Sequence, residues 1–136
     1  MKIDPETLQE CGACQEDMDS FMKHAHGHDI TAELTTRHAD KFDWDWAASR
    51  LLNREGKAEY ARVRREAHAE HNAAIEQSHA AFHGAVQGRK PSGWGSFAKD
   101  HAAFAKAAAE SRGAAKTNLI RRKAEAFGHL YERHKA

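Results

Sequence analysis

Cysteine and histidine residues gather near the N-terminus in a pattern typical of metal ligation. Both cysteines and three of the eleven histidines lie between residues 10 and 28. Cys-x2-Cys lets two thiolates approach one tetrahedral ion from a tight turn, and His-x3-His places two imidazoles one helical turn apart. The gap between the two pairs is shorter than the roughly 12 residues of a C2H2 finger, so a different fold would surround the ion. The candidate zinc ligands are Cys11, Cys14, His24 and His28, with His26 and His38 as alternative ligands.

The same stretch also fits a single amphipathic helix over residues 5–26. Asp4 is a typical N-cap and Pro5 a typical first helical residue. An apolar stripe follows at helical spacing: Leu8, Cys11, Met18, Phe21, Met22 and Ala25. In an unbroken helix Cys11 and His24 would lie about 20 Å apart, too far to share one ion. We favour the helix, with Cys11 on its apolar face, so we expect no cofactor and keep zinc as the alternative.

Catalytic patterns are not recognisable in the sequence. It contains no glycine-rich phosphate loop, no nucleophile elbow and no His-Glu-x2-His. Glu76-x2-His79, within the histidine- and glutamate-rich run 66–83, matches half of the motif of di-iron carboxylate bundles, which needs a second such pair. We therefore predict that the protein is not an enzyme and has no catalytic residues. A His/Glu metalloenzyme is the most distant alternative.

The composition predicts long helices around a thin core. Leu, Ile, Val and Phe together account for only 18 of the 136 residues, whereas 27 are alanine. Alanine has the highest helix propensity of all residues but buries little apolar area. Chains that cannot bury enough area alone are commonly stabilised by a partner. We therefore expect a homo-oligomer or incorporation into a larger protein assembly.

Charge is unevenly distributed along the chain. Residues 1–56 carry 6 basic and 12 acidic side chains, whereas residues 89–136 carry 11 and 4. Such halves can pair within one chain or between chains, or leave the basic half free for nucleic acid. The candidate residues for binding nucleic acid or an acidic partner are Lys116, Arg121, Arg122 and Lys123.

The helical spacing of apolar residues, interrupted by glycines and prolines, predicts an all-α fold of three to five helices. We expect these helices to form an extended bundle or hairpin with a long C-terminal helix. We expect one domain over residues 1–136. It comprises an acidic N-terminal part (1–56), a helix (57–87), a Gly/Pro hinge (88–95) and a basic C-terminal helix (96–136). Gly113 lies inside the last helix and is expected to weaken it by roughly 1 kcal/mol, enough for a kink.

Three tryptophans are the candidate partner-binding anchors. Trp44 and Trp46 are separated by about 200° on a helix, so both cannot point the same way, and we expect Trp44 to face a partner. Trp94 lies in the predicted hinge, where it can fill a groove between helices.

These observations predict a non-enzymatic structural or adaptor protein that assembles through helix–helix contacts, for example a small accessory or virion-type assembly component. The alternative is a zinc-stabilised helical module that binds nucleic acid through its basic C-terminal helix. The sequence starts without a recognisable signal peptide and has no apolar run of membrane-spanning length. We therefore expect a cytoplasmic or virion location and no membrane partner.

Overall fold

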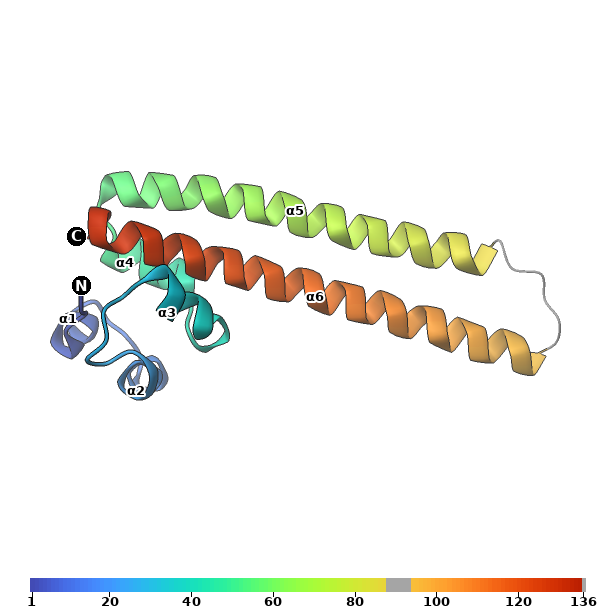
Figure 1. Cartoon of the computed structure of the whole chain (residues 1–136), viewed down its shortest axis with the longest axis horizontal. Coiled ribbons are helices and arrows are strands. Elements are labelled where there is room, and N and C mark those ends of the chain that lie inside the picture. The colour runs from blue at the N-terminus through green and yellow to red at the C-terminus, as the bar shows by residue number, and fades with distance from the viewer. Residues whose placement is uncertain (88–93, 136) are drawn as a thin grey trace. The chain divides into compact units, whose positions relative to one another are not determined.

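The computed structural model describes residues 1–87 and 94–135 of the chain, and the side chains of residues 1–84 and 101–135. Within these ranges the chain forms six α-helices and one short 3-10 helix, shown in Figure 1. They are α1 (Pro5–Glu10), α2 (Gln15–His24), α3 (Ala32–Arg37), η1 (Ala39–Lys41), α4 (Trp44–Leu51), α5 (Arg54–Gln87) and α6 (Trp94–His134). The predicted all-α class is confirmed, whereas the predicted number of three to five helices is too low.

The additional helices arise in the acidic N-terminal part, where the expected single helix over residues 5–26 is interrupted. The predicted cap is present, because the side chain of Asp4 accepts a hydrogen bond from the Glu6 amide at 3.2 Å. The chain then leaves the helix at Cys11, and Gly12 has a φ of 87°, which is left-handed backbone that glycine adopts without strain. Cys14 is the N-cap of α2, so the single-helix prediction is wrong at Gly12.

The two long helices lie close to their predicted positions. α5 begins at Arg54, three residues before its predicted start, and ends at Gln87 as predicted; α6 begins at Trp94, two residues inside the predicted hinge. Residues 88–93 of that hinge lie outside the described part. α6 continues through Gly113, so the glycine does not break the helix.

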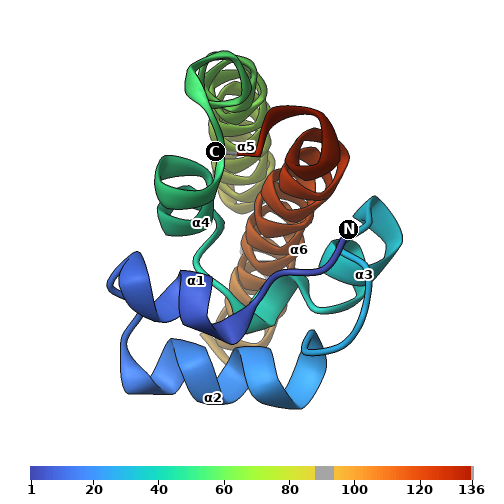
Figure 2. The same cartoon turned by 90° about the vertical axis from the view of Figure 1, so that its left-hand side faces the viewer.

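The chain divides into two compact units. Unit 1 comprises Met1–Ala67 and Ile120–Ala136, and unit 2 comprises His68–Leu119. In unit 1, α1 to α4 gather around the last turns of α6, as Figure 2 shows. Segments from both ends of the chain are therefore needed to complete this unit.

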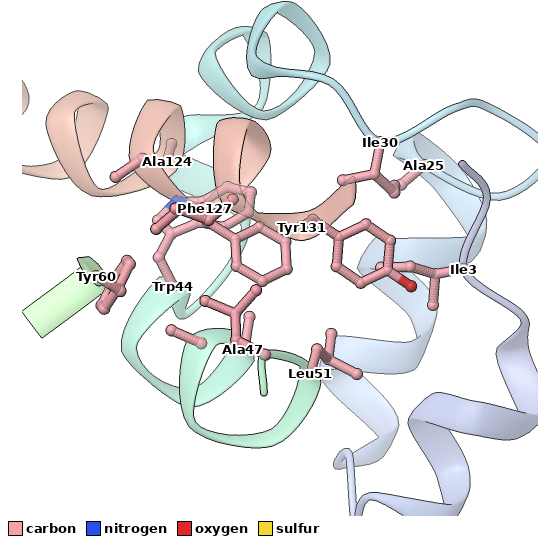
Figure 3. Packing of buried hydrophobic residues seen from close by; sticks show 14 of the residues in the cluster. Ile3, Ala25, Ile30, Trp44, Ala47, Leu51, Tyr60, Ala124, Phe127 and Tyr131 are labelled. Atoms are coloured by element: carbon pink, nitrogen blue, oxygen red, sulfur yellow. The ribbon is translucent and has the colours of Figure 1, made fainter. Parts of the chain in front are cut away.

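Aromatic side chains fill the centre of unit 1 (Figure 3). Trp44 is 6% exposed, and its ring centroid lies 5.6 Å from that of Phe127. Its indole nitrogen donates a hydrogen bond to the Ala39 carbonyl at 2.8 Å, which satisfies its only polar atom. The expectation that Trp44 faces outward is wrong, because α4 packs against α6 on the Trp44 side. The largest buried neighbours are Ile3, Leu8, Phe21, Ile30, Leu51, Leu52, Tyr60, Leu130 and Tyr131.

Unit 2 is a pair of antiparallel helical segments joined through a seam of small residues. Among its described side chains only Ser78, Ala108 and Ala115 are buried. The Ser78 hydroxyl donates a hydrogen bond to the Ala108 carbonyl at 3.2 Å. The larger apolar side chains of this unit remain partly exposed; they are Ile75, Phe82, Phe104 and Leu119.

Two glycines inside α6 make a matched test of this packing. A Cβ atom on Gly128 would lie 2.4 Å from Thr35 Oγ1 and 2.6 Å from the Ala32 Cα, whereas one on Gly113 would meet nothing within 4 Å. We expect Gly128→Ala to destabilise the protein by about 1–3 kcal/mol through overpacking against α3. Gly113→Ala should stabilise it by roughly 0.5–1 kcal/mol through helix propensity. Urea unfolding measures both, and the same sign for the two variants would contradict the described packing.

Candidate functional site

A partly buried carboxylate, Asp45, joins three helices of unit 1. Its Oδ1 accepts a hydrogen bond from the Tyr60 hydroxyl of α5 at 2.9 Å and lies 3.2 Å from the Arg64 Nε. Its Oδ2 accepts one from the Lys123 ammonium of α6 at 2.9 Å. The side chain of Lys123 is only 15% exposed, so this ion pair is better shielded from solvent than an ordinary surface pair. The cluster therefore ties α4 to both long helices.

The electrostatics of this cluster favour the charged carboxylate. Burial raises the pKa of Asp45, but hydrogen bonds from Lys123 and Tyr60 and the charges of Lys123 and Arg64 outweigh it. The net pKa is below the ordinary value for aspartate. Burial, together with the hydrogen bond to Asp45, raises the pKa of Tyr60, so its hydroxyl stays protonated and acts as a donor.

The residues predicted to contact nucleic acid do not form one basic surface. Lys123 is engaged by Asp45, and Lys116 is exposed on the part of α6 that belongs to unit 2. Arg121 lines a surface hollow that also contains Glu33 and Glu125, and Arg122 lines another that contains Glu59 and Glu125. Glutamates in both hollows offset the positive charge that a phosphate would need.

The two halves of the predicted zinc site lie at opposite ends of α2. Cys14 precedes its first residue and His24 is its last, which separates them by about 15 Å at 1.5 Å per residue. The exposed Cys14 thiol donates to Asp17 Oδ2 at 3.1 Å. Cys11 packs against the apolar core, as predicted from its place in the stripe. Burial raises the pKa of the Tyr131 phenol, and the nearby Cys11 raises it further. Cys11, Cys14, His24 and His28 therefore do not converge.

His24 instead lies against His38, which the sequence offered only as an alternative ligand. The two ring centroids are 4.7 Å apart with 34° between the ring planes. His24 ends α2 and His38 caps the C-terminus of α3, so the pair joins two elements that are separate in sequence. Burial lowers the pKa of His38, and the nearby charges of His24, Arg37 and His28 lower it further. Spacing alone could not reveal this pair, because the turns between α2 and α3 bring the rings together.

An apolar cavity of about 60 Å³ lies in unit 1 between the N-terminal helices and α4. Phe21, Trp44, Trp46 and Phe127 are among the residues that line it. A 150 Å³ apolar cavity holds a benzene ring, so this one is too small for a substrate of that size.

The other two predicted anchors have different positions. Trp46 is partly buried and packs against the core of unit 1, so it is not a free anchor. Trp94 is the first residue of α6, and its side chain lies outside the described part.

Comparison of the chain with protein-family models, with curated proteins and with solved structures finds no match. Among the described residues, no group of three or more histidine, cysteine, aspartate or glutamate side chains is arranged to hold a metal ion. No helix in the described ranges is long and apolar enough to cross a membrane.

The Asp45 cluster predicts a stability change with pH. Because the folded-state pKa of Asp45 is lowered, its contribution is present above the unfolded-state value of about 3.9 and is lost as pH falls below it. We expect Asp45→Asn to cost about 1 kcal/mol at pH 7, allowing for partial solvent screening.

The expected loss for Asp45→Asn should shrink towards pH 3 in urea unfolding curves. Glu33→Gln is the comparison variant, because the ion pair that it removes, with Arg37 at 3.0 Å, is exposed. Equal losses for the two variants at pH 7 would show that the cluster has no special role.

Proposed function

We propose that this chain is a non-enzymatic structural or adaptor protein that assembles through helix–helix contacts, and that unit 2 makes those contacts. The partner is a second copy of the chain or a larger helical protein. The observation that carries the proposal is the small-residue core of unit 2, in which no large apolar side chain among the described residues is buried.

The energetics of unit 2 support a partner. Burying a methyl-sized group contributes about 0.8 kcal/mol, whereas ordering each backbone residue costs roughly 1–2 kcal/mol. Alanine and serine in the seam offset little of that cost. Long helices in proteins obtain most of their stability from packing an apolar face, and here that face is incomplete. A second helical surface would cover Phe82 and Phe104.

An apolar hollow of about 230 Å³ offers the contact area. Phe82 of α5 and Phe104 of α6 lie at its sides. The remaining lining residues are small, which allows another helix to approach closely: Ser78, Ala81, Ala107, Ala108 and Ser111. Small residues at helix interfaces let backbones pack at short distance.

Charge favours a second copy as the partner. The described part of α5 in unit 2 carries Glu70 and Glu76 and no lysine or arginine. Over residues 101–119, α6 carries Lys106, Arg112 and Lys116 against a single Glu110. In a pair of hairpins, α5 of one copy beside α6 of the other would place opposite charges together.

Two exposed alanines of α6 provide a matched test of assembly. Ala107 lines the hollow and Ala109 does not, and both are exposed. We expect Ala107→Glu to weaken self-association at least about ten-fold, because it buries a charge without a partner. Ala109→Glu should leave association unchanged. Sedimentation velocity over a concentration series measures both.

Hydrogen exchange tests the proposal independently of the partner's identity. Under conditions where the chain is monomeric, the amides of unit 2 should exchange faster than the buried helices of unit 1. They should become protected when the chain associates or binds a partner. Equal protection of both units in the monomer would show that unit 2 needs no partner, and the proposal would fail.

A further inference from the structure

The rings of the histidine pair at the ends of α2 and α3 lie close enough to share one metal ion. Two imidazoles on one ion each place a nitrogen about 2.0–2.1 Å from the metal. With angles at the ion between about 90° and 109°, their ring centroids would lie roughly 4.5–5.2 Å apart. The centroids of His24 and His38 are separated by 4.7 Å. The fold therefore brings both rings within that range, and rotation of each side chain would aim one nitrogen of each ring at the ion.

The surroundings of the pair leave both rings available. Within the described part of the structure, neither imidazole ring of the pair makes a side-chain hydrogen bond or an ion pair; the hydrogen bonds of His38 are those of its backbone, such as its amide to the Leu34 carbonyl at 3.2 Å. Both rings are half-buried, so an ion between them would be partly shielded yet reachable from solvent. The nearby Arg37 is engaged by Glu33 at 3.0 Å, which offsets its repulsion of a cation.

His28 supplies a third imidazole close to the pair. It lies in the exposed turn after α2, four residues from His24, and near enough to His38 to influence its charge. The turn contains Gly27 with a φ of 80°, and nothing surrounds a Cβ built there, so the turn has room to adjust. His28 can therefore approach an ion already held by the other two rings.

We propose that His24 and His38 bind a divalent transition-metal ion of the zinc class, with His28 or water in the remaining positions. Imidazole nitrogens suit zinc, copper and nickel, whereas calcium and magnesium prefer oxygen ligands. The ion fastens the end of α2 to the end of α3 and so stabilises unit 1. The proposal does not depend on assembly through unit 2.

A second histidine pair provides an internal control. His79 and His83 lie one turn apart on α5, with ring centroids 6.5 Å apart. That separation exceeds what two nitrogens on one tetrahedral ion allow, so both exposed rings would have to turn towards each other before they could share an ion. We therefore expect this pair to bind more weakly than His24 and His38, which already lie close together.

The test is calorimetric titration of the untagged full-length chain with zinc chloride at pH 7.5. We expect one ion per chain, and a melting temperature that rises with zinc, because the unfolded chain lacks the preformed pair. His24→Gln and His38→Gln should each weaken binding at least about ten-fold. The double variant His79→Gln/His83→Gln should bind like the unchanged protein.

Three results would overturn the proposal. They are the absence of zinc binding, unchanged affinity in both His24→Gln and His38→Gln, and loss of binding only in the α5 double variant. Circular dichroism of each variant without metal shows whether it is folded. Cobalt in place of zinc gives a second readout. The visible spectrum of the bound cobalt ion reports nitrogen ligation directly, whereas the melting temperature also depends on the stability of the variant.

Discussion

The carboxylate of Asp45 fixes how the helices of unit 1 are aligned. Tyr60 and Arg64 approach it from α5 and Lys123 from α6, while Asp45 itself belongs to α4. Shifting either long helix by one turn would leave these groups without their partners at a partly buried position, which is costly. The aromatic packing of Trp44 against Phe127 relies on that alignment, since both belong to helices that Asp45 connects.

The two units differ in how they obtain stability. Unit 1 combines large apolar side chains, such as Leu52 and Phe127, with a satisfied polar cluster. Unit 2 relies on a seam of alanine and serine, with Phe82 and Phe104 only partly covered. A protein with one self-sufficient unit and one incomplete unit suits a component that is folded before assembly and completed by it. The same division separates the histidine pair of unit 1 from the surface of unit 2 that we propose for association.

Local rules were sufficient for part of this structure. The Asp4 cap and the periodicity of the long helices could be predicted because short-range interactions determine them. The break at Gly12 could not, since glycine costs a helix only about 1 kcal/mol and the packing of Leu8 and Phe21 decides the outcome. The burial of Trp44 likewise depends on Phe127, which is distant in sequence. For the candidate site, spacing identified His24 and His28, whereas the contact between His24 and His38 arises only from the fold.

The core of unit 1 is closed by residues near the C-terminal end of α6, including Phe127 and Tyr131. On the ribosome these residues are made after the whole of α1 to α5. At about 5–20 residues per second, the apolar faces of α1 to α4 would wait several seconds for their partner. The many charged residues of the acidic N-terminal part would keep this waiting segment soluble, since charge opposes aggregation of exposed apolar surface. The acidic composition thus has a use before the chain has folded.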